Sequence, residues 1–478
     1  MYPRQAFCAL PIGALGGWYT EQMARYRTPP TLTEAVYRKE WERLDELLAQ
    51  GHDLNDEAPT HRSDRRRMTP LMVAVEQQNL PLIRKLVKAG SDVNHTWAGN
   101  PMKAAIRTGN LDTVKLLHEL GVPLGSRKQG EPDYLLDALG MGHSRPEIME
   151  WLIGQGLDPC KENQKHKGWT LINTCLSSNS YPDQNRRTID LLLDAGVDPR
   201  IPSPLRDNDD YKQTYPIASA VGHGDPHVVR RFLQAGCDPN LVRDDYIGHA
   251  DGDECPLIVT ALLAKRVETR VDVLRALVEG GAHTDIKINF NPHSVGAVPT
   301  SPDRDETGMP DERMDHMPLV ALAACWSDAN TVNSLLEIGQ DIKACDRKGR
   351  NLLHGFLDHY RRNISHRHDA LDILNNLLAH GAEPNRGDEN GNTPLHFIFM
   401  HNLAGLRPGQ TSYADTVKLA ETLIAHGADP LQKNKNGRDC IELSGEHTAL
   451  AGLFASMSQQ RKLQDNTPAR GARPGRRL

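Results

Sequence analysis

Aromatic residues are scarce in this sequence, where they make up 5% of 478 residues. Large aromatic side chains supply much of the buried area in the cores that contain them. Their scarcity disfavours an aromatic-rich β-sandwich and favours a core packed from small aliphatic side chains.

A strong charge of one sign and long apolar runs are also missing. The formal net charge is -6 with 25% of residues charged. A chain so close to neutrality has no global attraction for nucleic acid or for an acidic membrane surface. No window reaches the roughly 18 uninterrupted apolar residues of a membrane-spanning helix. We therefore expect no membrane association, and nucleic acid is not a favoured partner.

The eight cysteines are scattered, and no two form a CxxC pair. This usage is typical of reduced thiols in the cytoplasm, and it gives no signal for a structural zinc site. At the N-terminus an apolar run from Ala6 to Trp18 is broken by Pro11 and by glycines. Such a broken run is a poor secretory signal. A cytoplasmic protein is the first expectation, and secretion into a host cell is the alternative.

What the sequence does contain is one phrase, repeated ten times. An apolar run with helical spacing ends in glycine, as in IRKLVKAGSDVN, IDLLLDAGVDP and AETLIAHGADP. Glycine after a helix is a common stop signal. The glycines that end the copies are Gly51, Gly90, Gly121, Gly156, Gly196, Gly236, Gly281, Gly339, Gly381 and Gly427. Their spacing runs from 31 residues (121 − 90) to 58 residues (339 − 281), which indicates a unit of somewhat above thirty residues with variable insertions.

The copies also open alike, with TPLH at 393–396, TPLM at 69–72, and worn forms such as NPMKAA, YPIASA, CPLIVT and MPLVAL. A period of about 33 residues with Thr-Pro-Leu-His opening one helix resembles the ankyrin repeat. The resemblance covers approximately residues 31–445. It implies an all-α solenoid of stacked helix-turn-helix units with hairpin loops.

Each part of a copy has a physical role. Thr393 can cap the first helix, and Pro394 fits its first turn because no intrahelical donor is needed there. Apolar stripes such as that of Leu395 need a neighbouring repeat to cover them. Gly427 is suited to the left-handed conformation at a helix end, and NKNG at 434–437 is typical of a hairpin tip.

Three regions follow from this pattern. Residues 1–30 are expected to form a leader or cap, and residues 31–445 a solenoid of about ten degenerate repeats. Residues 446–478 are expected to form a C-terminal cap and a disordered basic tail. Long insertions interrupt the solenoid near 200–214, 285–317 and 401–414. The segment at 285–317 has no regular period and is expected to be a long surface loop.

Histidines raise the question of catalysis or metal binding. His396 has two interpretations, a catalytic imidazole or a structural ring that bonds Thr393 and nearby backbone, and the resemblance favours the second. Four histidines cluster further back along the chain, at His354, His359, His366 and His368. A metal site needs ligands at tight spacing on rigid elements. We expect His354 to be the opening-helix histidine of its repeat and the other three to be solvated loop residues.

No other pattern signals chemistry. Four cysteines in opening segments are expected to be small buried thiols, namely Cys175, Cys255, Cys325 and Cys440. No catalytic triad, phosphate loop or cofactor motif is found. The arginines at 65–67 and the basic tail could attract phosphate, but solvated segments are favoured. We expect a non-enzyme without metal or cofactor.

The resemblance implies function through a surface. Stacked repeats present hairpin tips and first helices as one concave face that suits an extended protein partner. The predicted contacts are the tip residues Trp97, His166, Lys167, Arg347, Lys348, Asp388, Glu389, Lys435 and Asn436. The sequence therefore predicts a monomeric adaptor or inhibitor of a protein whose identity it does not give. The alternative is an effector-like protein that acts on a host or competitor-cell target.

Overall fold

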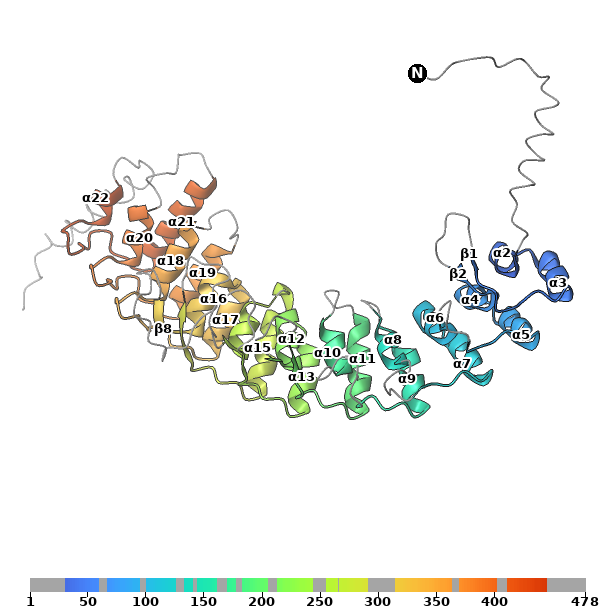
Figure 1. Cartoon of the computed structure of the whole chain (residues 1–478). Coiled ribbons are helices and arrows are strands. Elements are labelled where there is room, and N and C mark those ends of the chain that lie inside the picture. Colours follow the sequence, from blue (N-terminus) through green and yellow to red (C-terminus); the bar gives the residue numbers. More distant parts are fainter. Residues whose placement is uncertain are drawn as a thin grey trace, which may run out of the picture. The chain divides into compact units, whose positions relative to one another are not determined.

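The computed structural model describes residues 31–59, 67–94, 100–125, 133–140, 144–160, 170–177, 183–204, 213–243, 255–264, 266–290, 314–362, 369–401 and 411–444. The chain forms two compact units, Met1–Val197 and Asp198–Leu478. In the described parts of both units the main element is a short helix, and the helices follow one another in pairs (Figure 1).

Unit 1 contains five helix pairs among its described residues. They are α2 (Leu32–Arg38) with α3 (Trp41–Ala49), α4 (Pro70–Glu76) with α5 (Leu80–Lys88), α6 (Pro101–Thr108) with α7 (Leu111–Glu119), α8 (Tyr134–Leu139) with α9 (Pro146–Gly154), and α10 (Leu171–Ser177) with α11 (Asp183–Asp194). A short antiparallel pair, β1 (Ala58–Pro59) with β2 (Arg67–Met68), precedes α4.

Unit 2 repeats this plan. Its pairs are α12 (Pro216–His223) with α13 (Pro226–Gln234), α14 (Leu257–Leu262) with α15 (Arg270–Glu279), α16 (Leu319–Trp326) with α17 (Ala329–Glu337), α18 (Leu352–Arg362) with α19 (Ala370–Ala379), and α20 (Pro394–His401) with α21 (Thr411–Ala425). The 3₁₀ turn η1 (Val267–Thr269) precedes α15, and α22 (Cys440–Ser444) follows α21. Three antiparallel strand pairs precede first helices: β3 (Ser203–Pro204) with β4 (Gln213–Thr214), β5 (Val242–Arg243) with β6 (Cys255–Pro256), and β7 (Lys287–Phe290) with β8 (Met314–Pro318).

Within each unit, most helices pack on the equivalent helix of the next pair. In unit 1 the first helices α2, α4, α6, α8 and α10 contact one another in order, and in unit 2 the same holds from α12 to α22. The second helices form a parallel series, α5 to α11 in unit 1 and α13 to α21 in unit 2. The core is therefore a row of inter-repeat interfaces, filled mainly by aliphatic residues, with Tyr134, Phe232, Phe356 and Tyr360 as its largest buried side chains. This arrangement confirms the predicted stacked helix-turn-helix fold within each unit.

The predicted helix signals act as expected. Thr69 accepts the backbone N–H of Met72 at 3.2 Å, and Pro70 occupies the first turn of α4. All ten glycines predicted to end a helix have positive φ angles, from +75° at Gly51 to +112° at Gly90. This left-handed conformation costs glycine little and a residue with a Cβ atom much more.

Residues 285–317 differ from the expected long loop, because β7 and β8 pair at its two ends. Ile288, Met314 and Met317 are buried there, and a Cβ atom at Gly355 of α18 would overlap the sulfur of Met314. The few apolar residues that anchor this strand pair are too widely spaced to give a periodic signal. The remaining predicted insertion and terminal segments lie largely outside the described residues, at 1–30, 205–212, 291–313, 402–410 and 445–478.

Two predictions about single residue types can be checked directly. Cys175, Cys255, Cys325 and Cys440 are buried free thiols, as expected, although Cys255 lies in β6 rather than in a helix. The expectation that His359 is a solvated loop residue is wrong. His359 lies inside α18 and is 4% exposed, because this helix extends to Arg362.

Candidate binding surface at the hairpin tips

Three consecutive turns in unit 2 share one design, at residues 346–350, 388–392 and 434–438. We call them together the tip ladder. Each turn begins with Asp or Asn, whose side-chain oxygen accepts the backbone N–H groups of the third and fifth residues. The six distances, from Asp346, Asp388 and Asn434, lie between 2.8 and 3.1 Å. Short polar side chains suit this role because they can bond their own backbone two residues on.

The fourth residue of each turn is a glycine with positive φ. The angles are +74° at Gly349, +75° at Gly391 and +76° at Gly437. In each turn the glycine N–H donates to the carbonyl of the first residue at 2.8–2.9 Å, and the N–H of the first residue donates to the carbonyl of the fifth at 2.9 Å. The turns are therefore closed by the same four kinds of bond.

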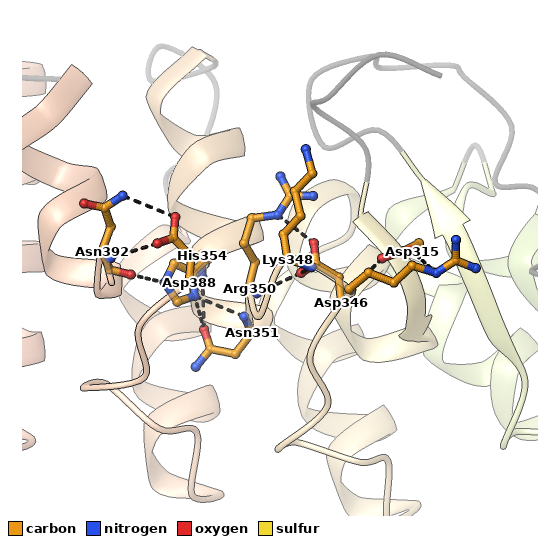
Figure 2. A network of polar contacts seen from close by, with 9 residues as sticks. Asp315, Asp346, Lys348, Arg350, Asn351, His354, Asp388 and Asn392 are labelled. Carbon is orange, nitrogen blue, oxygen red and sulfur yellow. Dashed lines mark hydrogen bonds and ion pairs between the residues drawn. The ribbon is translucent and has the colours of Figure 1, made fainter. Parts of the chain in front are cut away.

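Backbone bonds also join the turns to one another. The Glu389 N–H donates to the Lys348 carbonyl at 2.6 Å, and the Lys435 N–H donates to the Asn390 carbonyl at 2.9 Å. At the start of the ladder the equivalent donor, the Arg347 N–H, binds the Asp315 carboxylate at 2.9 Å. Asp315 of β8 thus takes the place of a preceding turn, and the ladder forms one continuous hydrogen-bonded unit. Figure 2 shows Asp315 with residues of the first two turns.

Histidines of the first helices fix the ladder to the helix stack. In α20 the Thr393 N–H donates to His396 Nδ1 at 3.2 Å, so that Nε2 carries the proton and donates to the Arg438 carbonyl at 3.2 Å. The Thr393 hydroxyl lies 2.8 Å from the same Nδ1. These contacts confirm the structural interpretation of His396. One repeat earlier, His354 of α18 bonds the Asn351 N–H and the Asn392 carbonyl, both at 3.0 Å.

Both rings are held in the neutral form. Burial lowers the pKa of the His354 imidazole to about 4, which outweighs the opposing bond to the Asn392 carbonyl. Burial also lowers the pKa of His396. Each ring contacts its own repeat through Nδ1 and the tip of the next repeat through Nε2, so each links the two.

A buried ion pair stiffens the first turn. Arg350 Nε lies 2.6 Å from Asp346 Oδ2, and the two side chains are 10% and 0% exposed. Burial raises the pKa of the Asp346 carboxyl, and the adjacent Arg350 guanidinium opposes that rise. A charged group this deeply buried depends on its partner, so the pair is part of the scaffold and not of the exposed surface.

The tip residues predicted from sequence fall into three groups. Arg347, Glu389, Lys435 and Asn436 are exposed, and Lys348 is half-buried. The Asp388 carboxylate is half-buried and serves its own turn. Trp97, His166 and Lys167 lie outside the described residues. The structure thus brings Arg347, Lys348, Asp388, Glu389, Lys435 and Asn436 together on one ladder.

Sequence reasoning missed three further residues of this surface. Arg438 is exposed at the fifth position of its turn. Asp315 and His316 hold the Arg347 guanidinium, at 2.8 Å from Asp315 Oδ2 to Nε and 2.9 Å from His316 Nε2 to Nη2. Comparing the aligned turns DRKGR, DENGN and NKNGR would have revealed Arg438. No local signal in the sequence marks Asp315 and His316, because a long insertion separates them from the preceding helix.

Other kinds of site find no support in the described part of the chain. It contains no group of three or more His, Cys, Asp or Glu residues arranged to hold a metal ion. Two members of the histidine cluster, His366 and His368, lie outside the described residues. None of its helices is both long and apolar enough to cross a membrane.

Helix pairs stacked in register, with left-handed glycines at their ends and hydrogen-bonded turns between them, define a helical-repeat protein. Residues 32–127 carry ankyrin repeats, because they match the family model described as "Ankyrin repeats (3 copies)". As a family, such repeats are protein-binding modules that use an extended surface.

Known proteins with similar sequences match about a fifth of this chain. Ankyrin repeat and SOCS box protein 11 from Homo sapiens is 34% identical over 95 residues, which covers 20% of this chain and 28% of that protein. The Mus musculus protein is 31% identical over 107 residues, or 22% of this chain and 31% of that protein. The chain therefore spans less than a third of the length of these relatives.

Solved structures with a similar fold include two ankyrin repeat domains. The human ASB11 domain is 20% identical, with a TM-score of 0.37, and the match covers 53% of this chain and 98% of that one. A domain from Acinetobacter baumannii AYE is 23% identical, with a TM-score of 0.34, and the match covers 43% of this chain and 98% of that one.

Proposed function

We propose that this protein is a non-catalytic binding protein, an adaptor or inhibitor, that holds a protein partner along the tip ladder of unit 2. The proposed contacts are Arg347, Lys348, Glu389, Lys435 and Asn436, with Asp388 holding its turn in shape. Trp97, His166 and Lys167 remain predicted contacts of unit 1. The protein is proposed to act as a monomer in the cytoplasm, without a cofactor.

One observation carries the proposal. The polar backbone groups of the three turns are largely bonded within the ladder or to Asp315, while Arg347, Glu389, Lys435 and Asn436 extend from it exposed. A surface of this kind is already ordered before binding, so a partner loses little conformational freedom of the protein when it docks. Exposed arginine is also a frequent anchor at protein interfaces.

The test is site-specific photocrosslinking in the cells that make the protein. A photoreactive phenylalanine analogue replaces Arg347, Glu389 or Asn436 in three separate variants. In matched controls it replaces Asn375 of α19 or Glu421 of α21, which are exposed on second helices. We expect one protein to be crosslinked from all three tip positions and from neither control.

A second arm links the crosslink to affinity. The crosslinked protein, once identified by mass spectrometry, is titrated against the parent chain and against a variant with Arg347, Glu389, Lys435 and Asn436 all changed to alanine. Exposed charges contribute only about 0.2–1 kcal/mol each, so the quadruple variant should weaken binding by about tenfold or more. Unchanged affinity, or crosslinks from the second helices alone, would refute the tip ladder as the site.

A further inference from the structure

The acidic and basic side chains of the tip ladder occupy different layers. Most of the acidic side chains here are aspartates, whose carboxylates bond other groups of the protein. Asp346 is completely buried against Arg350, and Asp388 accepts two backbone N–H groups of its turn. Asp439, just after the last turn, accepts the N–H groups of Ile441 and Glu442 at the start of α22. These carboxylates face their own scaffold.

Apart from the buried Arg350, the basic side chains are long and lie on the outside. Lys435 and Arg438 of the last turn are exposed, and Lys348 is half-buried. Arg347 is also exposed, with 73% of its side chain accessible to solvent. Glu389 is the single exposed acid among the described residues of the three turns. The surface that a partner meets is therefore more basic than the composition of the turns suggests.

Arg347 is exposed and yet held in place. Asp315 and His316 contact its Nε and Nη2 atoms, which leaves the Nη1 side of the guanidinium directed away from these two contacts. A guanidinium offers donors in a planar fork that matches a carboxylate. Because Asp315 and His316 already restrict this side chain, a carboxylate that binds it orders less of the protein than it would with a freely rotating arginine.

From this layering we infer that the partner presents an acidic, extended peptide segment, whose carboxylates bind Arg347, Lys348, Lys435 and Arg438 along the ladder. The inference rests on the proposed function and adds the chemistry of the partner. An acidic peptide fits better than nucleic acid because none of the three turns carries an aromatic side chain for base stacking, which single-stranded nucleic acid sites commonly use.

The test uses fluorescein-labelled decaglutamate as the probe and fluorescence anisotropy of the full chain as the measurement. In the ladder variant Arg347, Lys348, Lys435 and Arg438 are changed to glutamine. In the matched control Arg84, Lys85, Lys88 and Arg275, which are exposed on second helices, undergo the same change. Both variants lose the same total charge.

We expect decaglutamate to bind the parent and the control alike, and the ladder variant about tenfold more weakly, because each exposed pair is modest. Binding should weaken as salt is added. Glu389→Lys should strengthen decaglutamate binding severalfold because it removes the acid from the middle of the basic surface. A second variant, Lys435→Gln with Arg438→Gln, leaves Arg347 bonded to Asp315 and Arg350 bonded to Asp346. Its affinity for decaglutamate should still fall severalfold.

Three results would overturn the inference. These are equal weakening in the control and ladder variants, weaker binding by Glu389→Lys, or tighter binding of a labelled ten-nucleotide thymidine strand with the same dependence on the ladder residues. The last result would assign the surface to a phosphate backbone. The two experiments distinguish failure of the inference from failure of the proposed function. If a protein is crosslinked at the tips while decaglutamate binding ignores the ladder charges, the proposed function stands and the acidic partner is wrong. If the charges matter and no protein is crosslinked at the tips, the proposed function fails, and the inference about its partner fails with it.

Discussion

Replacing Gly391 by alanine tests whether the bonds between turns matter to stability. Gly391 has a φ of +75°, and a Cβ atom there would lie 3.0 Å from the Lys435 nitrogen and 3.3 Å from the Asn434 Cα. Gly437, one repeat later, has a φ of +76° and would place no atom within 4 Å of its Cβ. The two glycines therefore share a backbone conformation and differ in what surrounds them.

The expected costs follow from this difference. The left-handed conformation costs alanine about 1 kcal/mol, and this is the whole expected cost of Gly437→Ala. At Gly391 the added methyl group must also displace the Lys435 backbone, whose N–H bonds the Asn390 carbonyl at 2.9 Å. Losing one such bond adds about 1 kcal/mol. Gly391→Ala should therefore lower the free energy of unfolding of unit 2 by about 2 kcal/mol or more.

Two measurements check this result. Urea unfolding gives the stability of each variant, but a repeat array need not unfold in a single cooperative step. Hydrogen exchange adds a local reading, because the Lys435 amide should lose protection in Gly391→Ala and keep it in Gly437→Ala. Equal costs for the two substitutions, with the Lys435 amide protected in both, would refute the idea that the turns support one another.

Three other predictions concern the scaffold. Because the pKa of His354 is about 4 in the folded protein and about 6.5 when unfolded, the unfolded chain alone takes up this proton as the pH falls from 6.5 to 4. The contribution of His354 to the free energy of unfolding should therefore be fully present above about pH 6.5 and should decline by up to about 3 kcal/mol as the pH falls to 4. The variant His354→Gln, measured by unfolding at a series of pH values, should show a flatter decline. Arg350→Met should cost about 3 kcal/mol because it leaves a buried carboxylate without its cation, and adding Asp346→Asn should recover most of that loss in the same unfolding assay. Thr69→Ala should cost about 1 kcal/mol through loss of the helix cap of α4, and a thermal melt that matches the parent would contradict this estimate.

The helix pairs and their ends could be predicted from the sequence because their signals are local. A glycine that needs positive φ follows each apolar run, and all ten such glycines adopt it. The role of His396 could also be predicted, since the TPLH motif places its ring beside Thr393 within one turn of helix. In each case the residues that cooperate lie close together in the chain.

Contacts between distant residues could not be predicted in this way. Asp315 binds the Arg347 backbone across a separation of 32 residues, and its position depends on how β7 and β8 pair. His359 was misplaced because α18 continues beyond the length expected of a first helix. The outward layer of basic residues was missed for a related reason. Net charge counts Asp346 and Asp388 equally with Glu389, whereas Asp346 is buried and Asp388 is half-buried and bonded within its own turn.

The tip ladder divides its positions between two tasks. The first and fourth residues of each turn make the bonds that set its shape, and the histidines beneath bind the carbonyl of the fifth residue, whatever its side chain is. The second and third residues contribute backbone bonds between turns, which also do not depend on their side chains. Side chains at the second and third positions are thus largely released from folding. The fifth position is mixed: Arg438 is exposed, whereas Arg350 binds Asp346 and Asn392 is buried and bonds Asp388 and Asn434. Where a fifth-position side chain is part of the scaffold, the second position of the same turn still carries an exposed charge, Arg347 or Glu389. A surface built in this way can change its partner by substitution of a few long side chains while the stack beneath it stays the same.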